Sequence, residues 1–318
     1  MPIGTLRFAA CTFAYLCIVG FTNPQAAATQ GEEDKIHQSL TVLRAAETVD
    51  AAAVGYAGEQ TPTYKAFLVL GKHASDKQLI DLLDDPNTVI ATYAFWELSD
   101  RLDHEAIFPL LMEQLKRENP VQMFVGSTLY ESSVGDVALD MVELTGKKQE
   151  LVTDYLLTTD NRLSARSTLL QSLGIPKKYY KRIQTLAKKG EPHALVALAR
   201  FKREQDIDLI LSGLKDHPFY ALRAITCFPH ERFLPALAEY QKTLLPEQHW
   251  STTQREFYAA VSKYRDPLAL TILETPLDSE LTIPMRSYHI QFIKDAIAAE
   301  ASRYHNGLRK QLNVARVD

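Results

Sequence analysis

The chain has 318 residues, of which 46% are hydrophobic and 23% are charged, and its formal net charge is −4. This apolar content is too high, and this net charge too small, for an intrinsically disordered protein, so most of the chain is expected to fold. The length admits either two ordinary domains or one elongated array.

The first 28 residues have the pattern of a secretory signal peptide. Arg7 precedes an apolar run over residues 8–21, and three alanines at 26–28 provide a signal peptidase site. The run is shorter than the roughly 20 residues that cross a bilayer, so no stable membrane anchor is expected. The sequence therefore predicts a periplasmic or secreted protein, cleaved after Ala28. A buried N-terminal helix is the alternative.

The cysteine content predicts an exported protein that has no internal disulfide. Cleavage would remove Cys11 and Cys17 and leave Cys227 alone, so no internal bridge can form. The exported chain must then be stabilised by its apolar core. The sequence does not decide whether Cys227 is reactive.

Helical periodicity dominates the chain after residue 30. Ile207, Ile210, Leu211 and Leu214, for example, recur at the spacing of one helix face. Similar stripes recur along the chain, and no run of alternating strand residues stands out. An all-α fold is therefore predicted, with the aromatic residues of 93–96 interpreted as core packing.

The predicted helices are short and occur in antiparallel pairs. Tight turns within pairs, 27 to 45 residues apart, are predicted near Gly71, Arg101, Gly146, Gly174, Lys202, Pro229 and Arg265. Between pairs, an X-Pro step is predicted to open the next helix at Pro86, Pro120, Pro192 and Pro218. Helix pairs that recur in this way must stack to bury their apolar faces, as in a solenoid.

Two segments resemble a known repeat. Residues 79–98 (LIDLLDDPNTVIATYAFWEL) and, more distantly, 211–224 (LSGLKDHPFYALRA) are similar to short HEAT repeats of the phycobilisome-lyase type. The resemblance implies a right-handed, armadillo-like α-solenoid of about seven antiparallel helix pairs over residues 59–275, and with the predicted signal peptide the chain is expected to be an exported bacterial member of this superfamily. It departs from the family at 120–145, where one unusually long first helix is expected.

The ends of the array are expected to be capped. Residues 29–58 are predicted to form an N-terminal helical cap, and residues 276–318 a C-terminal capping helix with a tail. The capping helix is predicted from Pro284 to about Asn306, and the tail beyond Gly307 is expected to be loose.

Motifs for chemistry are weak. Ser212 and Lys215 match the Ser-x-x-Lys pairing of penicillin-binding enzymes, but their setting favours an exposed helix end. Residues 100–105 gather two aspartates, a histidine and a glutamate, which a helix N-cap explains. No catalytic residue, no metal site and no cofactor is therefore predicted.

Charge is divided along the sequence. Residues 29–160 carry 10 basic and 23 acidic residues, whereas residues 161–318 carry 24 and 16. Between residues 162 and 203, 11 basic residues accompany one acid, Glu191. A local excess of this size attracts an anionic partner. The predicted partner-binding residues, on one second helix, are Lys177, Lys178, Tyr179, Tyr180, Lys181, Arg182, Lys188 and Lys189.

The resemblance would place this second helix on the concave face of the solenoid. The leading hypothesis is thus an exported interaction protein that binds a protein partner with an acidic surface, since export argues against nucleic acid. Head-to-tail self-association, basic half to acidic half, is a further prediction. An immunity or inhibitor protein against a periplasmic toxin or enzyme, and a lyase-like enzyme on a HEAT scaffold, remain the alternatives.

Overall fold

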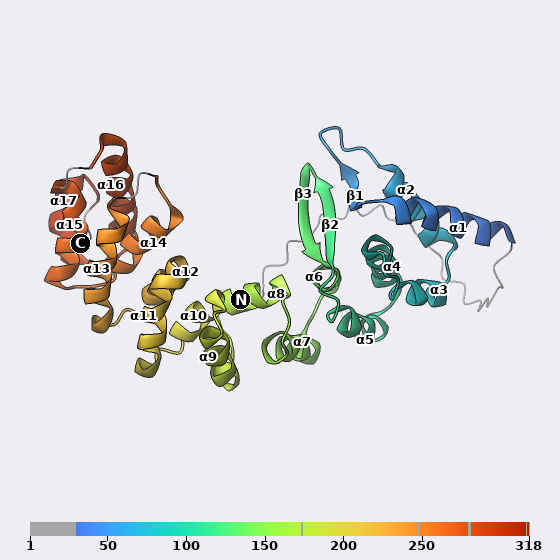
Figure 1. The fold of residues 1–318 in the computed structure, drawn as a ribbon, viewed down its shortest axis with the longest axis horizontal. Coiled ribbons are helices and arrows are strands. Elements are labelled where there is room, and N and C mark those ends of the chain that lie inside the picture. Colours follow the sequence, from blue (N-terminus) through green and yellow to red (C-terminus); the bar gives the residue numbers. More distant parts are fainter. Residues whose placement is uncertain (1–29, 173, 247–248, 279–280, 316, 318) are drawn as a thin grey trace. The chain divides into compact units, whose positions relative to one another are not determined.

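The computed structural model describes residues 30–172, 174–246, 249–278, 281–315 and 317 (Figure 1). The predicted signal peptide lies outside the described residues. The chain is 68% helical, with 17 α-helices and a small three-stranded mixed sheet in its described part. The prediction of a mainly helical protein is confirmed, and the prediction of an all-α fold is wrong.

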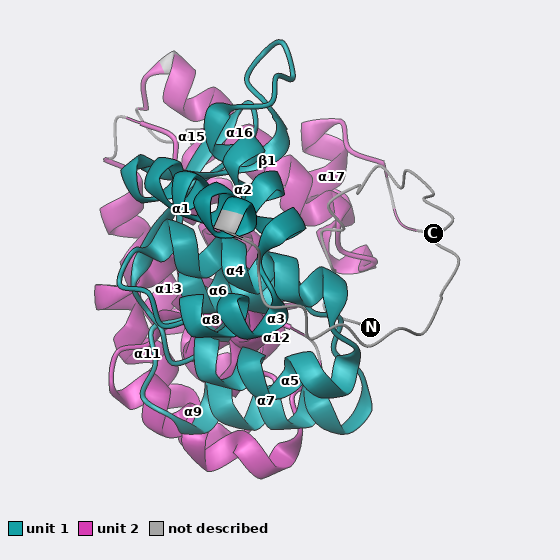
Figure 2. Cartoon of the chain, turned by 90° about the vertical axis from the view of Figure 1, so that its right-hand side faces the viewer, with its two compact units in different colours: residues 1–166 teal, residues 167–318 magenta. Residues whose placement is uncertain are grey.

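The chain divides into two compact units, residues 1–166 and residues 167–318, which Figure 2 colours separately. Unit 1 contains the sheet, the first seven α-helices and the beginning of the eighth. Its strands are β1 (Thr48–Val54), β2 (Pro120–Gly126) and β3 (Thr128–Ser133). Its helices are α1 (Gln30–Ala45), α2 (Pro62–His73), α3 (Asp76–Leu82), α4 (Thr88–Arg101), α5 (His104–Gln114), α6 (Val134–Asp140), α7 (Gly146–Thr158) and the start of α8 (Ser164–Gln171).

The sheet lies where the sequence predicted helices, in the N-terminal cap and after residue 119. β1 follows α1 within the predicted helical cap and pairs in parallel with β2, which pairs antiparallel with β3. The long helix predicted after residue 119 is instead a hairpin, because Pro120 begins β2 and Gly126 adopts a positive φ of 57° in its turn. The X-Pro prediction holds at Pro192 and Pro218, which each open a helix.

The sheet is attached to the helices through Tyr93 of α4. Its hydroxyl accepts a hydrogen bond from the Asp50 amide at 2.7 Å and donates one to the Asp50 carbonyl at 2.9 Å. Its ring stacks on Phe67 of α2, with ring centres 4.6 Å apart. Tyr93 and Phe95 are fully buried, which confirms their interpretation as core residues.

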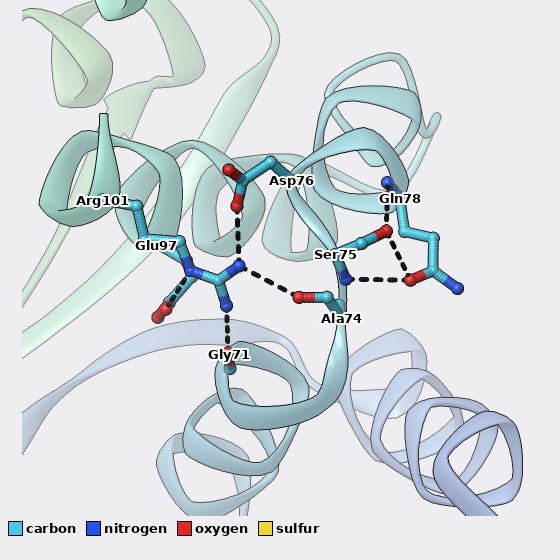
Figure 3. A network of polar contacts seen from close by, with 7 residues as sticks. All are labelled: Gly71, Ala74, Ser75, Asp76, Gln78, Glu97 and Arg101. Carbon is cyan, nitrogen blue, oxygen red and sulfur yellow. Dashed lines mark hydrogen bonds and ion pairs between the residues drawn. The ribbon is translucent and has the colours of Figure 1, made fainter. Parts of the chain in front are cut away.

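An arginine closes the turn between α2 and α3 (Figure 3). Arg101, the last residue of α4, donates to the carbonyls of Gly71 and Ala74 at the end of α2. It also pairs with Asp76 and Glu97, each at 2.8 Å. The last carbonyls of a helix have no partner within it, so the guanidinium supplies the donors they lack.

Unit 2 is entirely helical in its described residues. Its helices are α9 (Tyr180–Lys188), α10 (Pro192–Ala199), α11 (Ile207–Asp216), α12 (Pro218–Cys227), α13 (Leu234–Leu244), α14 (Thr252–Val261), α15 (Pro267–Asp278), α16 (Ile283–Ala298) and α17 (Asn306–Leu312). Short 3₁₀ helices are η1 (Lys177–Tyr179), η2 (Glu204–Asp206), η3 (Glu231–Phe233) and η4 (Arg303–His305).

The helices of unit 2 pack in a sequential order. α10 packs on α12, α12 on α14 and α14 on α16, while α9 and α11 pack on α10 and α12 respectively. This order is consistent with a repeat-like arrangement. Arg200 at the end of α10 repeats the role of Arg101, because it donates to the carbonyls of Leu170, Gln171 and Ser172 at the end of α8.

The C-terminal segment differs from its prediction. The predicted long helix ends at Ala298, and residues 306–312 form α17, with Leu308 and Leu312 buried. Arg309, 1% exposed, donates to the carbonyls of 297, 300 and 302. The chain beyond Gly307 is thus held in the core and is not a loose tail as far as residue 312.

Replacing Arg309 by methionine should lower the free energy of unfolding by about 3 kcal/mol, because buried carbonyls would lose their donors. Urea denaturation followed by circular dichroism measures the change. The matched control is Arg303→Met at an exposed position, which should stay within about 0.5 kcal/mol. Equal stability of the two variants would contradict the assigned role of Arg309.

Two buried histidines predict a pH dependence of stability. Burial lowers the pKa of His289, which lies 2.7 Å from the Tyr258 hydroxyl. Burial also lowers the pKa of His305 and outweighs the raising effect of the Ser262 carbonyl; Arg309 and Arg265 lower this pKa further, and Glu300 raises it. An unfolded chain titrates both imidazoles near pH 6.5. The unfolded state then binds more protons below that pH, so stability should fall as the pH drops below about 6.5.

Thermal unfolding between pH 8 and pH 5 tests this dependence. The midpoint should be constant above about pH 7 and fall below it, while the double variant His289→Gln/His305→Gln should show a shallower fall. If the thermal midpoint falls equally in the variant and the parent, groups other than these two histidines cause the pH dependence.

Candidate partner-binding surface on α9

The helix α9 is amphipathic, with a basic outer face. Ile183, Leu186 and Ala187 are buried, whereas Lys181 and Lys188 are exposed on the opposite side. This division follows from the helical period, which places residues three, four and seven apart on one face. The lysines therefore face solvent because the apolar residues between them are held in the core.

The exposed cations form a row along α9 and the turn before it. Lys177, Lys178, Lys181, Lys188 and Lys189 are exposed, and Arg182 is half-buried. From 178 to 188 the row extends about 15 Å at the rise of a helix. Within the described residues, Lys177, Lys181, Lys188 and Lys189 pair with no acidic side chain, so their charge is available to a partner.

The two predicted contact tyrosines are not on this surface. Tyr179 and Tyr180 are each 5% exposed, so their rings offer little surface for a partner to contact. Their rings instead lie beneath cations, since Lys178 Nζ is 4.8 Å from the Tyr179 ring centre. Contacts of this kind are favourable because the ring face is electronegative.

Arg203 is a surface residue that the sequence prediction omitted. Its Cζ lies 3.7 Å from the centre of the Tyr180 ring, although Arg203 follows α10. Arg203 is exposed and has no acidic partner in the described chain, so it extends the positive surface beyond α9. Only its place in the basic stretch 162–203 signalled it, since the ring contact joins residues 23 positions apart.

A buried polar network fixes the position of α9. Asp206, 1% exposed, accepts from the Tyr180 hydroxyl at 2.9 Å and from Gln184 Nε2 at 2.7 Å. Gln205 Nε2 donates to the same hydroxyl at 2.7 Å. Burial raises the pKa of Tyr180, and Asp206 adds to that shift, so the hydroxyl remains a donor at neutral pH.

The motifs set aside on sequence grounds have ordinary structural roles. The Ser212 hydroxyl donates to the carbonyl of Leu209 at 2.7 Å, within α11. Asp103 is the N-cap of α5, and the amides of Glu105 and Ala106 that bind its carboxylate lower its pKa. Burial and Glu97 raise the pKa of the neighbouring Asp100. In the described residues, no group of three or more metal-binding side chains lies together.

In the described part of the chain, every helix is too short or too polar to span a bilayer. Residues 1–29, which include the predicted signal peptide, lie outside the described residues.

No family model matches the chain, and comparison with curated proteins found no match. The class of protein is therefore defined by the fold alone. It is a mainly helical protein with many consecutive packed helices and one small mixed sheet.

Replacing Tyr180 by phenylalanine should cost about 2 kcal/mol of unfolding free energy, because the buried Asp206 carboxylate would lose a donor. Urea denaturation measures the loss. The same change at Tyr288, which is 43% exposed, should alter stability by less than about 0.5 kcal/mol. An unaffected Tyr180→Phe variant would show that the network does not hold α9 in place.

Proposed function

We propose that this protein is an exported, non-catalytic interaction scaffold that binds a partner protein through an acidic surface of that partner. The observation that carries the proposal is that four exposed lysines on α9 and beside it pair with no acidic side chain in the described residues, namely Lys177, Lys181, Lys188 and Lys189. Arg203 adds to the row, and the buried network around Asp206 holds the helix that presents it. A fixed positive surface of this kind steers an anionic partner and sets its orientation.

The fold proposed for the scaffold is a right-handed HEAT-like solenoid. The sequential packing of α10, α12, α14 and α16 supports stacked helix pairs. The similar positions of Arg101 and Arg200, each at a helix end that bonds an earlier helix end, support a repeated structural unit. In this fold, α9 would be a second helix and would line the concave face.

Export of the mature chain after Ala28 is part of the same proposal. The apolar run over 8–21 and the alanines at 26–28 support it. An exported chain would meet acidic proteins rather than nucleic acid, which is why a protein partner is proposed. Cys227, the one cysteine of the mature chain, is half-buried and forms no disulfide.

Charge reversal on α9 tests the binding surface. The variant Lys181→Glu/Lys188→Glu/Lys189→Glu should retain about tenfold less partner at 50 mM NaCl than the parent, because opposite charges would become like charges. The measurement is affinity capture by the mature chain from an extract of the producing cells, with quantitative mass spectrometry. Capture by the parent should also weaken at 300 mM NaCl.

The matched control changes the same number of charges elsewhere in unit 2. Lys215→Glu/Arg255→Glu/Lys310→Glu alters exposed cations outside α9 and should capture the partner as the parent does. Equal loss of captured partner in both triple variants would attribute the effect to net charge. Unchanged capture by both variants would contradict the proposal that α9 binds the partner.

The captured molecule also separates the alternatives. An immunity or inhibitor protein would retain a toxin or enzyme whose activity falls on binding. A lyase-like enzyme would turn over a small substrate without any captured protein. Head-to-tail self-association would yield the chain itself, and sedimentation would then show oligomers that the α9 variant does not form.

A further inference from the structure

The strand β3 is an exposed edge of the sheet in unit 1. The strand order is β1-β2-β3, so β3 has a strand neighbour on one side only. The side chains of residues 128–131 are all exposed, on both faces of the strand, and Leu129 is 60% exposed. Figure 1 shows β3 at the edge of the sheet, with β2 as its one strand neighbour in the described part of unit 1.

The hydrogen-bond register shows which backbone groups point outward. The Val134 amide donates to the Asn119 carbonyl at 3.1 Å, directly beyond the pairing of Pro120 with Ser133. Hydrogen-bonded and non-bonded positions alternate in an antiparallel pair. The amides and carbonyls of Leu129 and Glu131 therefore point away from β2. They have no backbone partner in the described chain.

The edge carries few of the features by which proteins usually prevent strand pairing. Such features are charged side chains (lysine above all), proline, a β-bulge or a covering segment, and of these β3 holds one carboxylate, Glu131. β3 reads Thr-Leu-Tyr-Glu-Ser-Ser, and its pairing with β2 is continuous from 120/133 to 125/128. It is thus free to accept another strand, the mode by which extended peptides bind exposed sheet edges.

The surroundings of the edge select the charge of the occupant. Residues 46–64 and 118–146, which contain all three strands, hold eight acidic residues and no lysine, arginine or histidine. The helix α6, which ends at Asp140, packs on β3, and burial together with Asp140 raises the pKa of Tyr130. On the face of Leu129, its cross-strand neighbour Phe124 is half-buried and adds apolar surface.

We infer that β3 binds an extended segment of a partner protein with alternating basic and apolar side chains, which adds a fourth strand to the sheet. Its backbone pairs with the outward amides and carbonyls of Leu129 and Glu131. Its apolar side chains pack on Leu129 and Phe124, and its basic side chains face Tyr130 and Asp140. This surface is separate from α9 and selects the opposite charge.

Two other occupants fit less well. A second copy that paired through its own β3 would bring two sheets together that carry acids and no bases, and like charges would repel. The chain's own residues 1–29 contain one basic residue, Arg7, and so cannot supply alternating positive charge. A basic strand from another protein has the charge opposite to that of the edge and can supply alternating positive side chains.

The probe is a fluorescein-labelled hexapeptide, Lys-Val-Lys-Val-Lys-Val, added to the mature chain at 50 mM NaCl. Fluorescence anisotropy measures its affinity, and site-resolved amide hydrogen exchange locates it. The amides of Leu129 and Glu131 should become protected on binding, whereas the Tyr130 amide, bonded to β2, should be protected already. Glu-Val-Glu-Val-Glu-Val should bind at least about tenfold more weakly.

Variants of β3 test the binding site by changing the protein instead of the peptide. Leu129→Pro removes an outward amide without breaking the ladder to β2 and should abolish binding, whereas Leu129→Thr keeps that amide and should weaken binding only mildly. Asp140→Lys should weaken binding several-fold, because the basic side chains face Asp140, and Glu150→Lys, an exposed charge-matched control on α7, should not. The thermal midpoint and the protection of Tyr130 verify that each variant is folded.

Peptide methylation covers the case in which the proline variant fails to fold. N-methylation of one alternate set of peptide amides should prevent binding, and methylation of the other set should leave it intact, since only one set faces β3. Equal effects of both sets, or no protection of Leu129 and Glu131, would overturn the inference.

The remaining outcomes identify another occupant or another surface. Equal binding of the acidic hexapeptide would refute charge selection. If the parent forms dimers and Leu129→Pro is a monomer, the edge binds a second copy. If the amides of Leu129 and Glu131 are protected only in the chain that retains residues 1–28, the edge binds that segment. The α9 triple variant should bind the hexapeptide like the parent, so failure of the α9 proposal would leave this result unchanged.

Discussion

The ends of the helices depend on side chains that supply hydrogen bonds to carbonyls the helices cannot satisfy themselves. An α-helix leaves its last carbonyls without intrahelical donors. Arg101 provides them for α2, Arg200 for α8, and Arg309 for α16. A guanidinium suits this task because its five donors are fixed in one plane and it stays charged at any physiological pH. Short helices with tight turns can stack because these ends are capped by a neighbour.

Tyrosine hydroxyls perform a related task for backbone groups that lie outside the helices. Tyr93 bonds both the amide and the carbonyl of Asp50, and Tyr264 bonds both those of His230. In each case the hydroxyl both accepts and donates, so two backbone groups are satisfied by one side chain. Tyr180 uses the same capacity toward Asp206 and Gln205, and the position of the lysines on α9 depends on it.

The cations of the candidate site were predictable, and the rest of that surface was not. Lysines between apolar residues at helical spacing must face solvent, so the sequence located Lys181 and Lys188 correctly on an exposed face. The burial of Tyr180 depends on Asp206, 26 positions later, and the position of Arg203 depends on the Tyr180 ring. Neither contact leaves a periodic signal, because both join segments that are distant in sequence.

The sequence by itself determined the helical content and many helix boundaries, because these depend on neighbouring residues. The Ser75–Gln78 capping box and the proline at 192 act within one turn of their helix. Only the tertiary structure decided the sheet. The β1 segment, Thr-Val-Asp-Ala-Ala-Ala-Val, contains three alanines, which favour helix locally. It is a strand because it pairs with residues more than seventy positions later, and such pairing outweighs local propensity.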